Sequence, residues 1–358
     1  MVNRVQNYAK KTFLAIDNRY KSVKKVYPNC IDDISESSGY FMGTKEVKTI
    51  SEAFISRLNR LGFSHHTIDK ASLSGRAIDL DLINPLTGNY MTGSSSGTAL
   101  NVFLGINDLG IGTDGGGSVL APAMSLNLCG FIHPEIGKDS ISKEEVKVST
   151  DGVVFSPSVG LITRELELIE CVIENEFSFE SKGKIRIATD TEELMSNEKL
   201  NKNNYDISLV EMSDKYTKER GELITDLTNL LEQYDIVISK EGPVDLQGFG
   251  DTIFGHFSDE TKAYQQLANK GFIRVANMVN AITLSVPTIQ LGEGYVLMSK
   301  NDAIMRQLIS IGKNIQADKD ELVERYFNDL SKYFEMGIWK GGWLKIILLF
   351  LVYFYDVF

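Results

Sequence analysis

The sequence contains few of the residues that cross-link chains or bind metal ions. Its 358 residues include three cysteines, Cys30, Cys129 and Cys171, and no two of them have CxxC spacing. The four histidines suggest no metal site either, because His65 and His66 are adjacent and the other two are isolated. We therefore expect neither a disulfide framework nor a bound metal, and a reducing compartment is favoured.

A targeting segment and an excess of positive charge are also lacking. Residues 1–13, MVNRVQNYAKKTF, have no apolar run that resembles a signal peptide, so a cytoplasmic protein is expected. The formal net charge of −11 would repel the phosphate backbone of a nucleic acid unless a local basic patch overrode it. The densest basic run, KSVKK at 21–25, is typical of a solvated face. No nucleic-acid partner is expected.

The elements that are present predict an α/β protein. The content of 43% hydrophobic and 24% charged residues is that of a soluble globular chain. A short buried strand is predicted over 12–18 (TFLAIDN), and a helix over 49–62, with Thr49 and Glu52 as a capping box and Gly62 as its stop. Helices and strands then alternate, which favours a layered α/β architecture. The predicted elements are a helix over 160–176, a strand over 182–189, a helix over 220–234 and a strand over 235–239.

One domain is expected over residues 1–340, followed by a hydrophobic tail over 341–358. No internal repeat or long linker divides the chain. The apolar stretch 343–355 of the tail contains Lys345 and is shorter than the roughly 17–25 residues that span a bilayer. Its length argues against membrane contact, although an interfacial anchor, a segment docked on the body and an abnormal terminus all remain open.

A glycine-rich stretch, GTDGGGSVLAP at 112–122, has the composition of an acyl-transfer site. Such a reaction needs a nucleophile, a base and donors for the negative charge that develops on the carbonyl oxygen. Glycines allow backbone N–H groups to approach a reacting atom, so Gly115, Gly116 and Gly117 suit an oxyanion hole beside Ser118 as nucleophile. The alternative is a phosphate-binding or merely tight turn, but neither GxGxxG nor GxxxxGK[ST] is present.

A second hydroxyl-rich loop, TGSSSGTAL at 92–100, precedes the first one. The segment 84–118 is predicted to form a loop, a helix, a strand and a loop, with its two hydroxyl-rich ends brought together. The whole block NPLTGNYMTGSSSGTALNVFLGINDLGIGTDGGGSVLAPA (84–123) resembles the signature block of the amidase signature family in loop order and separation. The similarity extends in order over roughly residues 12–315. The other matching segments are CGFIHPEIG (129–137), SVGLITRELE (158–167), YDIVISKEGPV (234–244) and NMVNAITLSVPTIQLGEGYVL (277–297).

The resemblance implies a fold and a set of roles. The fold is a twisted, mixed central β-sheet sandwiched by α-helices, with the two Ser/Gly loops converging at one edge of the sheet. Ser118 matches the nucleophile, Ser94 the bridging serine that follows a cis peptide bond, and Ser95 a supporting serine that helps to order the loop. In the family, a lysine deprotonates the bridging serine.

Three positions depart from the family pattern. The family lysine ends an apolar strand and is followed by Asp-Asn, and the matching run FLAIDN has Ile16 in its place. Leu120 replaces an arginine, and Ser96 replaces a glycine of the first loop. Without a base, Ser94 could not pass on a proton. Neighbouring lysines that could substitute, none with a clear claim, are Lys10, Lys11, Lys21, Lys24 and Lys25.

These observations predict a divergent and weakened amidase-like hydrolase that cleaves a C–N bond in a small-molecule amide through an acyl-enzyme on Ser118. No cofactor is implied. The alternative is a catalytically inactive pseudo-amidase with a role in binding or as the partner of another protein. Assembly as a homo-oligomer, or with partner subunits like those of the tRNA-dependent amidotransferases, also remains open.

Overall fold

The computed structural model describes residues 4–31, 39–138, 146–149, 151–178, 183–201 and 205–327. Residues 1–317 belong to one compact unit. The described part of a second unit, residues 318–327, contains helix α11 (Glu321–Phe327). The predicted tail over 341–358 lies outside the described residues. None of the described helices is long and apolar enough to cross a membrane.

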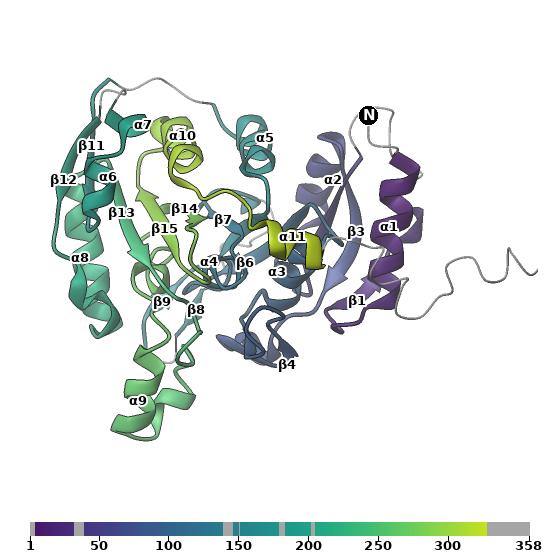
Figure 1. The fold of residues 1–358 in the computed structure, drawn as a ribbon, viewed down its shortest axis with the longest axis horizontal. Coiled ribbons are helices and arrows are strands. Elements are labelled where there is room, and N and C mark those ends of the chain that lie inside the picture. The colour runs from purple at the N-terminus through teal and green to yellow at the C-terminus, as the bar shows by residue number, and fades with distance from the viewer. Residues whose placement is uncertain are drawn as a thin grey trace, which may run out of the picture. The chain divides into compact units, whose positions relative to one another are not determined.

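The first unit is built around a large mixed β-sheet (Figure 1). Within the described residues the sheet has eleven strands, in the order β1-β3-β2-β6-β10-β7-β14-β15-β13-β11-β12. Its strands are β1 (Val23–Val26), β2 (Tyr40–Lys45), β3 (Phe63–Asp69), β6 (Leu109–Asp114), β7 (Cys129–Ile132), β10 (Ser158–Thr163), β11 (Ile185–Thr189), β12 (Tyr205–Leu209), β13 (Ile236–Glu241), β14 (Ile282–Pro287) and β15 (Gly294–Ser299). Two separate hairpins pair β4 (Ile78–Ile83) with β5 (Tyr90–Thr92), and β8 (Lys147–Val148) with β9 (Val154–Phe155).

The helices lie between the strands in the sequence, as the predicted alternation requires. Strand β2 runs parallel to β3 and β6, whereas β10 runs antiparallel to β6 and β7, so the sheet is mixed. The prediction of an α/β protein with a mixed central sheet is confirmed. The helices of the first unit are α1 (Arg4–Asp17), α2 (Glu52–Arg60), α3 (Ser96–Phe103), α4 (Leu120–Met124), α5 (Leu166–Glu176), α6 (Glu192–Met195), α7 (Glu198–Asn201), α8 (Arg220–Gln233), α9 (Asp259–Gln266) and α10 (Met305–Ile315).

Helices pack on both faces of the sheet. Leu109 and Ile111 of β6 belong to the buried apolar cluster that includes residues of α2, α5 and α10. Gly110 points the other way, because a Cβ atom there would lie 2.6 Å from Cγ2 of Thr98 on α3. Successive side chains of a strand alternate between its faces, so α3 covers the face opposite to α2 and α5.

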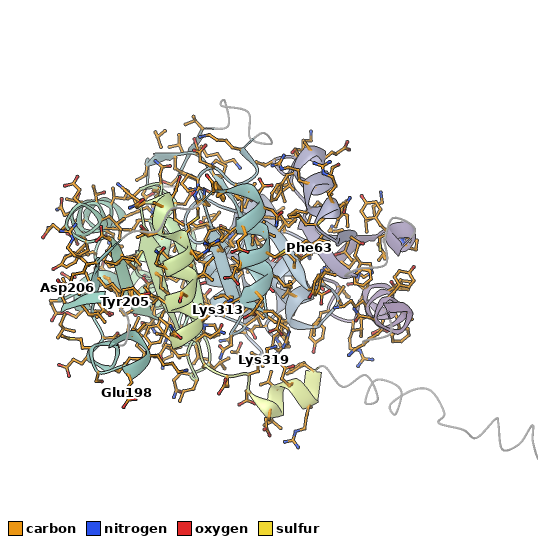
Figure 2. The ribbon with its side chains drawn as sticks, turned by 90° about the horizontal axis from the view of Figure 1, so that it is seen from above. Phe63, Glu198, Tyr205, Asp206, Lys313 and Lys319 are labelled. Carbon is orange, nitrogen blue, oxygen red and sulfur yellow. The ribbon has the colours of Figure 1, made fainter. Side chains whose placement is uncertain are left out.

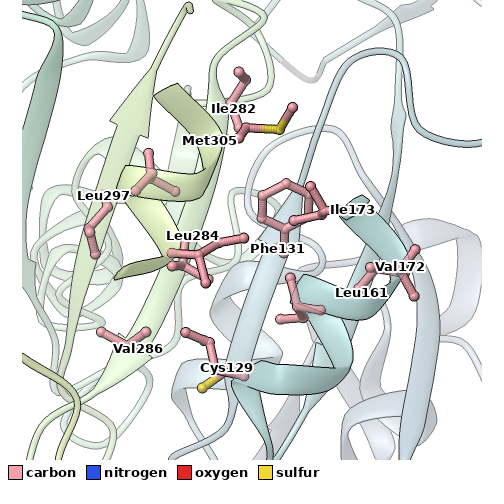
Figure 3. Packing of buried hydrophobic residues seen from close by; sticks show 14 of the residues in the cluster. Cys129, Phe131, Leu161, Val172, Ile173, Ile282, Leu284, Val286, Leu297 and Met305 are labelled. Carbon is pink, nitrogen blue, oxygen red and sulfur yellow. The ribbon is translucent and has the colours of Figure 1, made fainter. Parts of the chain in front are cut away.

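The core on the α5 side is closely packed. Figure 3 shows Phe131 of β7 and Leu284 of β14 with Ile173 of α5 and Met305 of α10, and each of these side chains is at most 1% exposed. Lys313 of α10, labelled in Figure 2, donates to Glu170 of α5 over 2.5 Å. Apolar burial of about 25 cal/mol per Å² is the main contribution that holds these helices on the sheet.

Some predicted elements differ from those observed. Residues 12–17 belong to helix α1, so the strand predicted over 12–18 is wrong. Helix α2 confirms the helix predicted over 49–62, but its cap is Ser51, which accepts from Phe54 N, and not Thr49. Gly62 follows the helix with a φ of 92°, as expected of a stop.

The elements predicted farther along the chain agree more closely with those observed. The first part of the helix predicted over 160–176 is the end of strand β10, and the helix itself begins at Leu166. Helix α8 and strand β13 confirm the predictions over 220–234 and 235–239. The described part of the strand predicted over 182–189 is β11.

Candidate functional site

The site lies where two parallel strands end. Strand β2 pairs with β6 in parallel, so their carboxyl ends, Lys45 and Asp114, point to the same side of the sheet. Both strands are interior to the sheet order. The Ser/Gly loops therefore converge at the carboxyl ends of interior strands and not beside an edge strand, as is common for sites of open α/β sheets.

Lys45 contacts the first serine loop directly. Its Nζ atom lies 2.7 Å from Ser94 Oγ, 3.0 Å from Thr113 Oγ1 and 3.3 Å from the Thr113 carbonyl oxygen. The Lys45 residue is 4% exposed. Three oxygen atoms thus hold the amine in one position, within reach of a proton transfer from Ser94.

Burial changes the charge state of this lysine. The pKa of Lys45 is lowered from 10.5 to about 7, mainly because burial removes the ammonium group from water; the charge of Asp114 opposes this shift and that of Lys147 adds to it. A large fraction of the Lys45 side chains is therefore neutral at physiological pH. A neutral amine can accept a proton, whereas an ammonium group cannot.

The two hydroxyl-rich loops come together as predicted. Ser95 N donates to the carbonyl oxygen of Ser118 over 3.1 Å, and Ser72 N donates to the carbonyl oxygen of Ser94 over 3.1 Å. The peptide bond between Gly93 and Ser94 is cis. Ser94 and Ser95 are both buried. These contacts fix the loop backbone on both sides of the Ser94 side chain.

Asp114 organises the glycine turn that carries Ser118. Its carboxylate accepts from the N–H groups of Gly117 (2.7 Å), Val119 (2.6 Å) and Leu120 (3.3 Å). Burial raises the pKa of Asp114, and the three N–H groups and Lys45 partly offset this effect. Ser118 itself is half-buried.

The same contacts decide which glycines have free donors. The Gly117 N–H is already used by Asp114, and Gly116 is exposed to solvent. Among the described residues, the N–H groups of Gly115 and Gly116 have no hydrogen-bond partner. These two donors, rather than all three predicted glycines, remain available for an oxygen atom of a ligand.

Ile16 does not occupy the position predicted for it. It lies on helix α1, and its side chain is 68% exposed. The residues before FLAIDN continue its apolar pattern with the period of a helix, so the run forms part of helix α1. The run alone is too short for its period to distinguish a helix from a strand. Lys11, one of the substitutes considered, is engaged by Asp108 over 2.9 Å.

The lysine that contacts Ser94 is Lys45, so the prediction that Ser94 lacks a lysine partner is wrong. A signal for it was present in the sequence, because YFMGTKE at 40–46 is an apolar run that ends in a lysine and an acidic residue. The match of Asp17 and Asn18 to the family pattern drew the assignment to the wrong run.

The other two departures are accommodated by local contacts. Leu120 begins helix α4 and is completely buried, so an apolar contact stands where the family arginine was expected. Ser96 begins helix α3, and its Oγ donates to Asp79 Oδ2 over 2.5 Å. Within the described ranges, no three His, Cys, Asp or Glu side chains come together in a group that could hold a metal ion.

Comparisons with known proteins give a partial sequence match and a shared fold. Residues 82–175 match the family model described as Amidase. No curated protein matches the sequence. The solved structures that match this chain have low sequence identity to it, so their similarity shows the fold alone.

Three solved structures are representative. A 6-aminohexanoate cyclic dimer hydrolase is 13% identical with a TM-score of 0.62, covering 92% of this chain and 95% of that chain. A glutamyl-tRNA(Gln) amidotransferase subunit from Thermotoga maritima is 14% identical with a TM-score of 0.58, covering 88% and 93%. A bacterial aryl acylamidase of the amidase signature family is 12% identical with a TM-score of 0.58, covering 93% and 95%.

Proposed function

From an amidase-family sequence match over residues 82–175 and a fold shared with amidase signature enzymes, we propose that this chain hydrolyses the C–N bond of a small-molecule amide through an acyl-enzyme on Ser118. The observation that carries the proposal is the contact between the buried Lys45 amine and the Ser94 hydroxyl, 2.7 Å apart. It supplies the base that the sequence alone did not reveal.

The proposed acylation transfers two protons, one from each serine. Neutral Lys45 takes the Ser94 hydroxyl proton while Ser94 takes that of Ser118, and the Ser118 oxygen attacks the amide carbonyl carbon. The negative charge that develops on the carbonyl oxygen is stabilised by the N–H groups of Gly115 and Gly116. When the C–N bond breaks, the proton on Lys45 returns through Ser94 to the leaving nitrogen.

In deacylation, water replaces the serine as the nucleophile and the same residues transfer its proton. A water molecule attacks the ester carbonyl and passes its proton through Ser94 to Lys45, and that proton is then returned to Ser118 as the ester C–O bond breaks. The products are a carboxylic acid and an amine or ammonia. No step requires a cofactor or a metal ion.

A small amide is the substrate class that we propose, and the presence of an aryl acylamidase and a cyclic-dimer hydrolase among the structural neighbours supports it. The pseudo-amidase alternative depended on Ile16 in the lysine position, and the contact between Lys45 and Ser94 removes that reason. The similarity to an amidotransferase component keeps assembly with partner subunits as a separate hypothesis.

The rate at which a fluorophosphonate probe labels Ser118 is expected to rise with pH through a midpoint near 7. Burial lowers the pKa of Lys45 to about 7, so below that pH the ammonium form predominates and cannot accept the proton. The rate should fall about tenfold per pH unit well below the midpoint and level off above it. The measurement is the labelling rate between about pH 5.5 and 9, on either side of that midpoint, with circular dichroism to monitor the fold.

Ser118→Ala is the control for the site of labelling, and the probe should not label this variant. A wild-type rate that does not change over this pH range would contradict the role of Lys45 as the base. A wild-type protein that the probe does not label at all would favour the pseudo-amidase.

A further inference from the structure

One segment, residues 270–274, touches the glycine turn without taking part in the proposed reaction. The carbonyl oxygen of Ile273 lies 3.0 Å from the position that a Cβ atom of Gly117 would occupy. The carbonyl oxygen of Arg274 lies 3.3 Å from the equivalent position at Gly116. The segment therefore packs directly against the backbone that precedes Ser118.

A buried carboxylate holds this segment in place. Glu241, the last residue of β13, is completely buried, and it accepts from the N–H groups of Gly271 (2.8 Å), Phe272 (2.7 Å) and Ile273 (3.4 Å). A Cβ atom on Gly271 would lie 2.9 Å from the Glu241 carboxyl carbon, so the segment approaches this carboxylate closely. Hydrogen bonds to a carboxylate are stronger than those between neutral groups.

A buried lysine balances the charge of Glu241. Lys215 is 3% exposed, and its charge opposes the increase in the pKa of Glu241 that burial causes. The Lys215 Nζ donates to Ser239 Oγ over 2.8 Å and to the Lys240 carbonyl oxygen over 2.6 Å, and it pairs with Asp190. Contacts with β13 thus anchor Lys215, and Glu241 is itself the last residue of that strand.

The other end of the segment is linked to the first serine loop. Lys270 Nζ lies 2.7 Å from Asp245 Oδ2, with the two side chains 8% and 4% exposed. The same oxygen accepts from Thr92 Oγ1 over 2.6 Å. Thr92 directly precedes Gly93 and Ser94 in the chain. One short segment therefore reaches both loops of the site.

We propose that residues 270–274 form a strut that sets the position of Ser118 relative to Ser94, and that Glu241 is its positioning residue. This inference rests on the proposed function, because its consequence is the alignment of the two serines. A displacement of about 1 Å at a reacting group can reduce a rate about 100-fold. Three N–H groups held by one carboxylate restrict such a displacement.

Glu241→Gln tests the strut with a side chain of nearly the same shape. The amide nitrogen donates and does not accept, so at least one backbone N–H of the strut loses its partner. We expect the maximal rate of fluorophosphonate labelling at Ser118 to fall about 10–100-fold, while the half-saturating probe concentration changes less than about threefold. The pH midpoint near 7 should stay unchanged, because the charges that shift the pKa of Lys45 are those of Asp114 and Lys147.

Hydrogen exchange of the peptide covering 112–122 gives a second readout that does not depend on activity. It should be faster in Glu241→Gln than in the wild type, because the carbonyl groups of Ile273 and Arg274 no longer restrain the turn. Glu241→Asp keeps the charge and shortens the reach, so an intermediate loss is expected, and it serves if the glutamine variant does not fold.

The matched control is Glu176→Gln. Glu176 binds Arg57 over 2.8 and 3.1 Å and joins α5 to α2, so this variant also loses a partly buried carboxylate contact but touches neither serine loop. We expect its labelling and its exchange over 112–122 to match those of the wild type.

The outcomes separate the strut from the proposed function. Unchanged exchange over 112–122 in Glu241→Gln would overturn the strut, whatever the activity. Faster exchange with unchanged labelling would overturn its positioning role. A wild type that is not labelled, combined with faster exchange in the variant, would overturn the proposed reaction and with it the positioning role, and leave only the mechanical contact.

Discussion

Replacing Lys45 with methionine is expected to reduce the labelling rate of Ser118 by at least about 10²–10⁴-fold, the usual contribution of a general base. Methionine approximates the length and volume of the side chain but removes the amine that contacts Ser94. The glycine turn and Ser118 itself remain in place. The loss should therefore appear in the maximal labelling rate rather than in the binding of the probe.

The same substitution is expected to stabilise the fold, by roughly 1–3 kcal/mol at pH 7. The pKa of Lys45 is 10.5 as a free side chain and about 7 in the fold, so the unfolded chain binds the proton more tightly between these values. Stability of the wild type must then increase with pH from about 7 to 10.5. The advantage of Lys45→Met should be largest below pH 7 and should shrink as the pH approaches 10.5.

Chemical denaturation at about pH 6.5 and about pH 9.5, on either side of the folded-state pKa, measures this difference. Lys11→Met is the matched control, because Lys11 is also buried but is paired with Asp108 over 2.9 Å. Its removal leaves that carboxylate without the lysine and should destabilise the protein without changing Ser118 labelling. If Lys45→Met were destabilising and still labelled at the wild-type rate, Lys45 would be a structural residue.

Gly117→Ala is expected to reduce Ser118 labelling about 100-fold or more and to destabilise the fold by roughly 1–3 kcal/mol. Gly117 has a φ of 95°, which L-residues rarely adopt, and its added Cβ atom would lie 3.0 Å from the Ile273 carbonyl oxygen. The alanine must move the turn or the strut. Either movement disturbs the Gly117 N–H contact with Asp114 and hence the position of Ser118.

Gly88→Ala separates backbone strain from the steric contact. Gly88 has a φ of 75° and nothing within 4 Å of the added Cβ atom. It should lose about 1 kcal/mol of stability and keep the wild-type labelling rate. Equal labelling by Gly117→Ala and the wild type, measured well below both melting temperatures, would mean that the turn does not orient Ser118.

The sequence by itself determined the local elements around the two serines. Helix α3 and strand β6 could be predicted because the apolar stretch between the two loops is long and the glycines and serines mark its ends. Ser94, Ser95 and Ser118 could be proposed as site residues from the resemblance to the amidase signature family, since each lies in a short motif whose residues are neighbours in the chain. The α/β class followed from the alternation of helical and strand patterns.

Only the tertiary structure decided which lysine reaches Ser94. Lys45 comes to the site through the parallel pairing of β2 with β6, and such pairing is set by contacts between residues distant in the sequence. The helix that contains Ile16 was mistaken for a strand because a short apolar run has no decisive period. The contacts of the strut with Gly116 and Gly117 are equally long-range, since Glu241 and Asp245 act from the far half of the chain. Local sequence patterns indicate which secondary structure a segment favours. The packing of the whole sheet determines which residue contacts a buried charged side chain.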